Sequence, residues 1–248
     1  PERNLLKAEP ESCRQIGLKY PIVYNRQTAK LRHINRPGFR TITLSMLFRP
    51  EEGGAGLERA MGELCARASD AVDAGYTMLI LSDKGVNEAF APIPSLLATA
   101  GVHHHLVRQG TRTRCSLLVE TGEAREVHHM ALLIGYGAGA INPYLAFESL
   151  DDMVREGLLP GVTDEQATFN YIKALNKGIL KVMSKMGIST VQSYCGAQIF
   201  EAVGLNQEFV DRCFTWTASR ISGVGIDVIA EETAQRHARA DRKSTRLN

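Results

Sequence analysis

The sequence has no apolar run of the ~18 residues that a membrane-spanning helix needs, and its start, PERNLLKAEPES, lacks the apolar core of a signal peptide. It also has little net charge, since 29 Lys and Arg residues stand against 27 Asp and Glu residues. A dedicated binder of nucleic acid or of a membrane surface needs a strong field of one sign. We therefore expect a soluble chain whose partners include neither nucleic acid nor a membrane.

Cysteine pairs with metal-binding spacing are also missing, because no two cysteines form C-x-x-C. Nor does the sequence contain G-x-S-x-G, a G-K-[ST] loop or H-E-x-x-H. The sequence thus predicts no catalytic, cofactor-binding or metal-binding residue in this chain. We expect the five cysteines to be reduced thiols that pack as small hydrophobic side chains: Cys13, Cys65, Cys115, Cys195 and Cys213.

What is present is a regular alternation of strand-like and helix-like segments. Residues 41–48, 77–81 and 115–120 are apolar runs typical of strands buried in a parallel sheet. Apolar residues recur at helical spacing between them, for example over 57–72. About five strands can be counted, too few to close an eight-stranded barrel. The prediction is an α/β fold, a parallel sheet with flanking helices that forms an incomplete (β/α) barrel-like domain.

The later part of the chain is predicted in less detail. Thr163 and Gln166 have capping-box spacing and begin a helix that ends near Gly187. Short strands are expected near residues 140–141 and 189–192, and further helices near residues 197, 207 and 227. Residues 1–40 form an opening segment of the domain, residues 41–238 its α/β body, and residues 239–248 a non-native or disordered tail.

Polar residues follow the predicted strands, where parallel α/β sheets gather their chemistry. Such residues line a functional rim in one interpretation and serve only as turns and helix caps in the other. A free-standing enzyme would use Lys84, Asp83 or Glu120 as acid or base. The candidate site residues are Ser82, Asp83, Glu120, Glu123, Asn142 and Tyr194.

Two further motifs carry weaker signals. Three adjacent histidines, 103–105, cannot converge on one metal ion from a helix, and His104 is expected to be a core residue with a hydrogen-bond partner. Lysines repeat every fourth residue on the predicted helix after Thr163, which indicates either a solvated face or a surface that docks on an acidic partner. They are Lys173, Lys177, Lys181 and Lys185.

Long blocks of this sequence resemble the central domain of the glutamate synthase large subunit. The resemblance runs from about Asn4 to about His237, with the blocks in the same order. The blocks are PIPSLLATAGVHHHL (92–106), VETGEAREVHH (119–129), LIGYGAGAINPYLAFE (133–148), NYIKALNKGILKVMSKMGIST (170–190) and QSYCGAQIFEAVGL (192–205).

The resemblance implies a central domain with barrel-like α/β topology and no flavin of its own. In the family, an amidotransferase domain releases ammonia from glutamine. A tunnel carries the ammonia to an FMN-binding barrel, where it reacts with 2-oxoglutarate to give glutamate. The partners implied are therefore these two domains of the same polypeptide, and FMN and an iron–sulfur cluster belong to the intact enzyme. The implied location is the cytoplasm, or the plastid for a plant-type parent.

The resemblance leads us to expect an internal fragment of an oxidoreductase that is inactive alone. Its role would be to link the amidotransferase and flavin domains and to line part of the ammonia tunnel, with the six candidate site residues at the tunnel wall or at domain interfaces. The alternatives are a free-standing α/β enzyme with a strand-end site and a pure interaction module.

Overall fold

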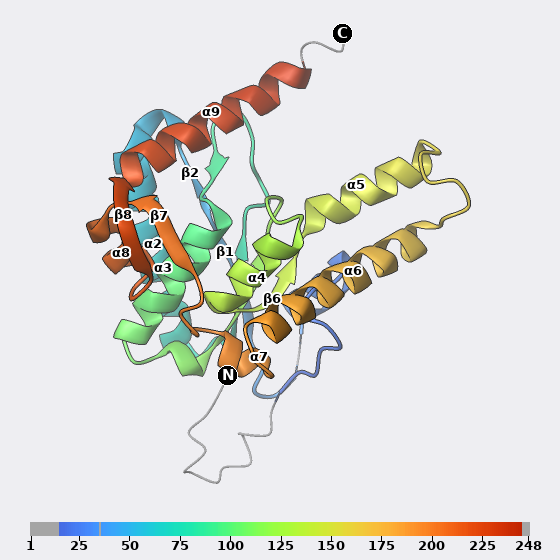
Figure 1. Cartoon of the computed structure of the whole chain (residues 1–248), viewed down its shortest axis with the longest axis horizontal. Helices are drawn as coiled ribbons and strands as arrows, with labels where there is room; N and C mark the ends of the chain where they lie inside the picture. Colours follow the sequence, from blue (N-terminus) through green and yellow to red (C-terminus); the bar gives the residue numbers. More distant parts are fainter. Residues whose placement is uncertain (1–14, 35, 245–248) are drawn as a thin grey trace.

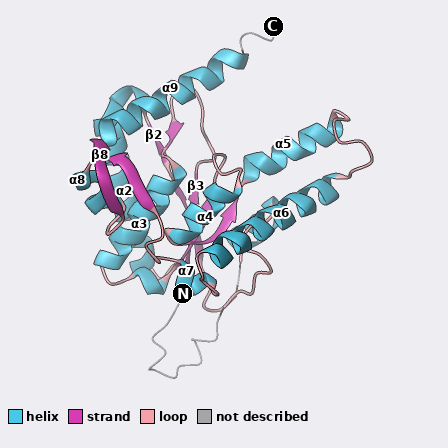
Figure 2. Cartoon of the chain, viewed as in Figure 1, coloured by secondary structure: helices cyan, strands magenta, loops and turns pink. Residues whose placement is uncertain are grey.

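A parallel four-stranded sheet forms the centre of the chain (Figures 1 and 2). The computed structural model describes residues 15–34 and 36–244. Each connection between neighbouring strands contains a helix, as parallel pairing requires. This confirms the predicted parallel sheet with flanking helices. The order in the sheet is β1 (Thr41–Ser45), β3 (Met78–Ser82), β5 (Ser116–Glu120) and β6 (Ala138–Asn142), connected by α2 (Gly53–Asp73), α3 (Ser95–Arg108) and α4 (Val127–Gly135).

The segment before β1 extends the sheet beyond β6. Ile22 forms a parallel bridge with Ile141, whose amide donates to the Pro21 carbonyl at 2.8 Å. Helix α1 (Asn25–Arg32) follows directly. The opening segment is therefore built into the sheet, while β1 forms the opposite edge.

The two faces of the sheet have different coverings, which follows from the alternation of side chains along a strand. Leu79 and Leu81 of β3 belong to the large core shared with α2, α3 and α4. Ile80, between them, packs on the other face, in a small cluster against which Leu31 of α1 lies. Helix α1 thus covers the face that the connecting helices leave open.

Beyond β6 the chain forms a hairpin of two helices that extends away from the sheet (Figure 1). These are α5 (Tyr144–Arg155) and α6 (Asp164–Lys185). The Thr163 hydroxyl accepts from the Gln166 amide, which confirms the predicted start of α6. The four lysines of the stripe on α6 are exposed, as a solvated face requires. The acidic-partner alternative stays a prediction.

The remaining elements include a second, separate parallel pair. Short strands β2 (Leu47–Phe48) and β4 (Ala91–Pro92) pair antiparallel, and 3-10 turns cover Pro50–Glu52 and Arg112–Arg114. The last elements are α7 (Val191–Tyr194), β7 (Glu201–Leu205), α8 (Gln207–Cys213), β8 (Ala218–Val224) and α9 (Ile226–Ser244), with β7 parallel to β8 and α9 packed on α2.

The structure of this region differs from the sequence predictions at several points. Residues 189–192 are not a strand, because the Thr190 hydroxyl accepts from the Ser193 amide and begins helix α7. Residue 197 lies in a loop, and β7 and β8 were not predicted at all. Helix α9 continues through residues 239–244, which the sequence assigned to the tail, while residues 245–248 lie outside the described residues.

The three histidines of α3 behave differently from one another. Arg112 Nε donates to His103 Nδ1 at 3.0 Å, and His105 Nε2 lies 2.8 Å from Ser69 Oγ. His104 Nε2 is buried without a hydrogen-bond partner among the described residues, contrary to the expected partner.

None of the helices in the described part of the chain combines the length and the apolar composition that a membrane span requires.

Candidate functional site

The register of the sheet places four polar residues in one row at the carboxyl ends of the strands. Ser45 is the partner of Ser82, Ser82 of Glu120, and Glu120 of Asn142. Three of them, Ser82, Glu120 and Asn142, are predicted site residues, which the structure brings together. We call these four residues the strand-end row.

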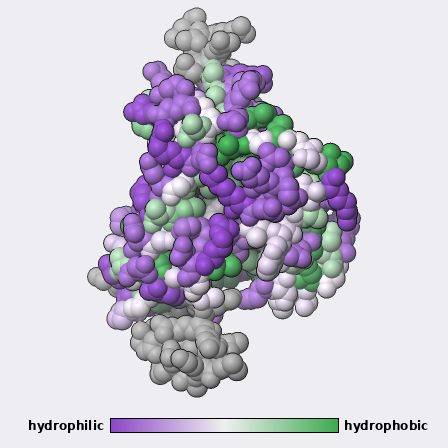
Figure 3. Space-filling view, turned by 90° about the vertical axis from the view of Figure 1, so that its left-hand side faces the viewer, coloured by the Kyte–Doolittle hydropathy of each residue, from purple (hydrophilic) through white to green (hydrophobic). Residues whose placement is uncertain are grey.

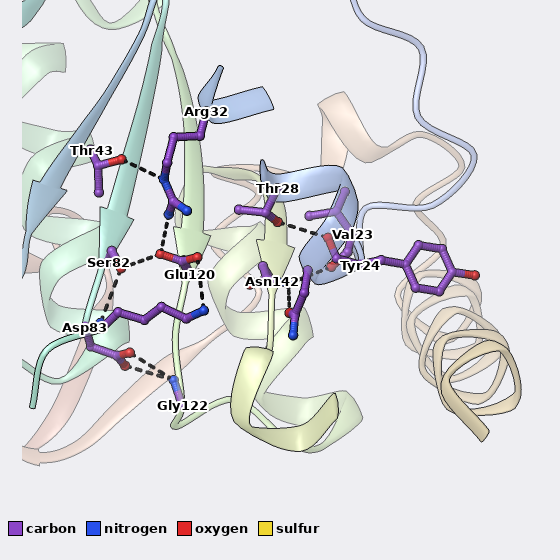
Figure 4. Close-up of polar contacts among 12 residues, drawn as sticks. Val23, Tyr24, Thr28, Arg32, Thr43, Ser82, Asp83, Glu120, Gly122 and Asn142 are labelled. Atoms are coloured by element: carbon purple, nitrogen blue, oxygen red, sulfur yellow. Dashed lines mark hydrogen bonds and ion pairs between the residues drawn. The ribbon is translucent and has the colours of Figure 1, made fainter. Parts of the chain in front are cut away.

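Glu120 is the centre of the row and is almost fully buried, with 2% of its side chain exposed. Its Oε2 accepts from Arg32 Nη2 at 2.6 Å and from the Ser82 hydroxyl at 2.5 Å (Figure 4). Lys84 Nζ lies 3.8 Å from Oε1. A buried carboxylate is tolerated only when it is paired and hydrogen-bonded, and here two cations and a hydroxyl do so.

Arg32 links this carboxylate to α1. Besides its bond to Glu120, its Nε donates to Thr43 Oγ1 of β1 at 3.2 Å. One guanidinium therefore joins α1 to both β1 and β5, as Figure 4 shows. Arg32 was not predicted from the sequence, because its partner Glu120 lies 88 residues away. The segment around Arg32 is punctuated by proline and has no sustained helix or strand periodicity.

Asp83 organises the loop after β5. Its carboxylate accepts from the Thr121 hydroxyl at 2.6 Å. It also accepts from the Gly122 amide at 2.9 Å, as Figure 4 shows. Burial raises the pKa of Asp83, and these hydrogen bonds oppose the rise. Burial, and then the charge of Asp83, raise the pKa of the Tyr144 hydroxyl, which also hydrogen-bonds Asp83. Tyr144 was another residue that sequence reasoning missed.

Asn142 fixes the opening segment at the end of β6. Its Nδ2 donates to the Val23 carbonyl and to Asn25 Oδ1, both at 2.9 Å (Figure 4). Its Oδ1 is buried and has no hydrogen-bond partner among the residues described. Asn142 therefore holds the start of α1 with its donor group and keeps an unused acceptor at the strand ends.

The last two predicted residues, Glu123 and Tyr194, lie outside the strand-end row, as Asp83 does. Glu123 Oε2 accepts from the Ser95 amide at 2.6 Å, at the N-terminus of α3, where the helix dipole favours an anion. Tyr194 is buried on α7, and the centroid of its ring lies 6.3 Å from the centroid of the Phe200 ring. Placing Tyr194 at a strand end was wrong, since no strand precedes it.

The opposite end of the sheet is where Tyr194 belongs. Just after α7, the Gly196 amide donates to the carbonyl of Gly135, the last residue of α4. Strand β6 begins at Ala138, three residues after Gly135, so α7 lies near the amino ends of the strands. Sequence reasoning had no signal for this position.

The described residues do not fit an iron–sulfur cluster or another metal. Within residues 15–34 and 36–244, no group of three or more His, Cys, Asp or Glu residues could hold a metal ion. Burial raises the pKa of the Cys115 and Cys213 thiols, and that of Cys65 to about 11. Raised values disfavour the thiolate that binds metals.

Nor do the strand ends fit a flavin phosphate. Two buried carboxylates, Glu120 and Asp83, lie at the carboxyl ends of the strands. A phosphate bound there would need amide or cationic donors. Both Arg32 and Lys84 lie against Glu120. The arrangement can hold neighbouring chain segments in place, and its acidic groups have internal partners.

Comparison with known proteins shows which protein family this sequence resembles. Residues 1–206 match the family model described as "Glutamate synthase central domain". The glutamate synthase (NADPH) large chain of Bacillus subtilis (strain 168) is 46% identical over 239 residues, which are 96% of this chain and 15% of that protein. Glutamate synthase (NADH) of Schizosaccharomyces pombe is 45% identical over 242 residues, 96% of this chain and 12% of that protein.

A plant relative gives a similar match. Ferredoxin-dependent glutamate synthase 1 of Arabidopsis thaliana is 40% identical over 242 residues, and the match covers 93% of this chain and 15% of that protein. The chain thus spans about one seventh of the curated relatives' length. Among solved structures, a flavocytochrome b2 mutant with benzoylformate has a TM-score of 0.46 at 13% identity, over 63% of this chain and 33% of that one. On the family match and these sequence identities, the chain belongs to the glutamate synthase central domain family.

Proposed function

We propose that this chain is the scaffold between the amidotransferase and flavin domains of a glutamate synthase, and that it lines part of the path of ammonia. The family match supports the setting. The observation that carries the proposal is the internal pairing of the strand-end carboxylates. Glu120 holds α1, and Asp83 holds the loop after β5. Both carboxylates therefore stabilise the proposed wall.

Ammonia gives a physical reason for such a wall. In bulk water ammonia is protonated and diffuses away, so an enzyme that releases it in one domain and uses it in another needs a closed conduit. A rigid sheet with polar residues at its strand ends provides one side of it. The proposed wall residues are Ser82, Asp83, Glu120, Glu123 and Asn142, while Tyr194, at the opposite end of the sheet, is a proposed domain-interface residue.

The same contacts weigh against a free-standing enzyme with a strand-end site. An acid or base must reach the proton that it transfers. Glu120 is buried behind Arg32 and Ser82, and both Asp83 oxygens accept from neighbouring groups of the chain. FMN and an iron–sulfur cluster, which the resemblance implies for the intact enzyme, are assigned to its other domains.

The test measures coupling in a full-length enzyme. This chain would replace the matching segment of the Bacillus subtilis large chain, with Ser82→Val or Glu120→Gln introduced in it. We expect the variants to hydrolyse more glutamine per glutamate formed, and glutamine-driven synthesis to fall more than ammonia-driven synthesis. Glu51→Gln, at an exposed ion pair, is the control. An unchanged ratio of glutamine hydrolysed to glutamate formed in both variants would refute the wall.

A further inference from the structure

The second parallel sheet, β7 with β8, exposes apolar side chains to an unusual degree. Val203 and Ile221 are direct partners in the register and are 68% and 61% exposed. Purely parallel sheets normally have both faces covered by other elements. Among the described residues this sheet consists of two strands, and each therefore has an open edge.

Next to this sheet lies the chain's only tryptophan, Trp216, which is 82% exposed. The Thr217 amide donates to the Phe214 carbonyl at 2.9 Å, so residues 214–217 form a turn. Trp216 is the third residue of that turn and has a φ of 66°, in the left-handed region that favours glycine. A bulky residue in that conformation is a genuine outlier.

The first and last residues of this turn are held by contacts with Tyr136. The Phe214 ring is buried against Tyr136, and the Thr217 hydroxyl lies 2.7 Å from the Tyr136 hydroxyl. The structure thus fixes the turn and points a strained tryptophan away from its own core. Strain of this kind persists where the surroundings over-determine it, and it clusters at functional positions.

The sheet itself is tightly built, so the exposure does not result from loose packing. A Cβ on Gly223 would lie 2.2 Å from the Gly204 carbonyl oxygen, and Gly204 has a φ of 78°. Only glycine allows the two strands to approach in this way. We define Val203, Trp216 and Ile221 as the β7–β8 patch.

One ion pair lies within the sheet that carries the patch. Arg220 of β8 pairs with Glu201 of β7 at 3.1 Å. Figure 3 looks onto the side of the molecule where β7, β8 and α8 lie in Figure 1, and hydrophobic residues are visible there between hydrophilic ones. A partner for such a surface is apolar, and tryptophan is one of the residues enriched among the anchors of protein interfaces.

The position of the patch relative to the family domain indicates the occupant. The family match ends at residue 206, between β7 and α8, whereas curated relatives match 96% of the chain. The patch therefore lies across the end of the family match, with Val203 inside the match and Trp216 and Ile221 beyond it. In the Bacillus subtilis protein, the match accounts for only 15% of the large chain.

We propose that the β7–β8 patch packs against an apolar surface of another domain of the same large chain, with Trp216 as its anchor. This rests on the proposed function, because it takes the chain to be one domain of a glutamate synthase. The contact would cover the open parallel sheet and explain why a tryptophan occupies a turn position suited to glycine.

The test compares this chain alone with the chimaeric Bacillus subtilis large chain that contains it. Hydroxyl-radical oxidation of Trp216 is measured by mass spectrometry in both. We expect oxidation to be at least tenfold slower in the full-length protein. A photo-crosslinking amino acid at position 203 is expected to join peptides outside the matched segment of the same polypeptide.

Variants of the patch sharpen the result. Val203→Asp is expected to restore oxidation of Trp216 in the full-length chain to at least half of the rate in the chain alone, and Arg220→Gln, at the edge of the patch, to leave oxidation slow. Trp216→Gly is expected to keep or raise the melting temperature of the chain alone, since glycine relieves the turn.

Two results would overturn the inference. One is equal oxidation of Trp216 in the two proteins, and the other is crosslinking only between two copies of the chain. Glutamate synthesis by the chimaera is a separate readout for the proposed function. An active chimaera with an exposed Trp216 would refute the patch alone, and a folded but inactive chimaera with a protected Trp216 would refute the proposed function alone.

Discussion

At the scale of single residues, the buried ion pair of Glu120 with Arg32 is one of the contacts that hold the opening segment on the sheet. Its carboxylate contacts α1 through Arg32 and β3 through Ser82. Removing one partner of a buried pair leaves the other charge uncompensated, which is more harmful than losing an exposed pair.

Glu120→Gln is therefore expected to lower the free energy of unfolding by about 1–3 kcal/mol, since Arg32 is partly exposed and solvent screens part of the loss. Urea denaturation at pH 7 measures it. Glu51→Gln, which breaks the exposed pair with Arg49, is the matched control and is expected to change stability by less than about 0.5 kcal/mol. Equal effects of the two substitutions would contradict this account.

His103 makes stability depend on pH. Burial, then the charge of Arg112, lower its pKa from 6.5 to about 3. The folded state therefore holds His103 neutral at a pH where the unfolded chain binds a proton. Its contribution to stability is complete above pH 6.5 and is lost as the pH falls from 6.5 towards 3.

His103→Asn is expected to make this loss shallower, by up to about 1.4 kcal/mol per pH unit, because one proton no longer distinguishes the two states. Asparagine can still accept from Arg112 through its side-chain oxygen. Urea denaturation at several pH values between 7 and 4.5 gives both slopes. Parallel curves for the two proteins would show that His103 does not titrate in this way.

At the scale of elements, the start of α6 was predicted because the Thr163 side chain marks it. Thr163→Ala is expected to lower the free energy of unfolding by about 1 kcal/mol, since the Gln166 amide loses its acceptor. Thermal and urea unfolding would measure it, with Ser184→Ala, at an exposed position near the end of the same helix, as the control. A larger effect at Ser184 than at Thr163 would contradict the capping role.

The sequence predicted the central strands because β3 and β5 are apolar runs, and buried parallel strands require such runs. It did not predict β7 and β8, since their exposed residues lack the apolar pattern on which such a prediction depends. The β-branched residues near 190 suggested a strand, but the hydroxyl of Thr190 begins a helix instead.

The candidate site could be predicted only in part for a similar reason. Residues at strand ends can be found from the order of the strands, so Ser82, Glu120 and Asn142 were identified together. Their partners Arg32 and Asn25 could not, because α1 reaches the row only through the bridge of Ile22 to β6. Long-range contacts of this kind leave no periodic trace in the sequence.

At the scale of the whole molecule, the described residues form a four-stranded sheet, two two-stranded sheets and a helical hairpin that extends from the body (Figures 1 and 2). The carboxylates at the strand ends of the four-stranded sheet, Glu120 and Asp83, are hydrogen-bonded to other segments of the same chain. The turn before β8 and the hairpin expose apolar groups, among them Trp216, Phe169 and Leu180. This distribution suits a domain whose inner contacts keep it rigid and whose outer surfaces meet other domains.

The central claim is that the chain supports chemistry carried out elsewhere, and catalysis by the purified chain tests it most directly. The chain would be supplied with FMN, 2-oxoglutarate, ammonia and a reductant, and glutamate formation would be followed against a sample without protein. The account predicts the same background rate in both samples. Glutamate formed above that background, in proportion to the amount of chain added, would contradict it.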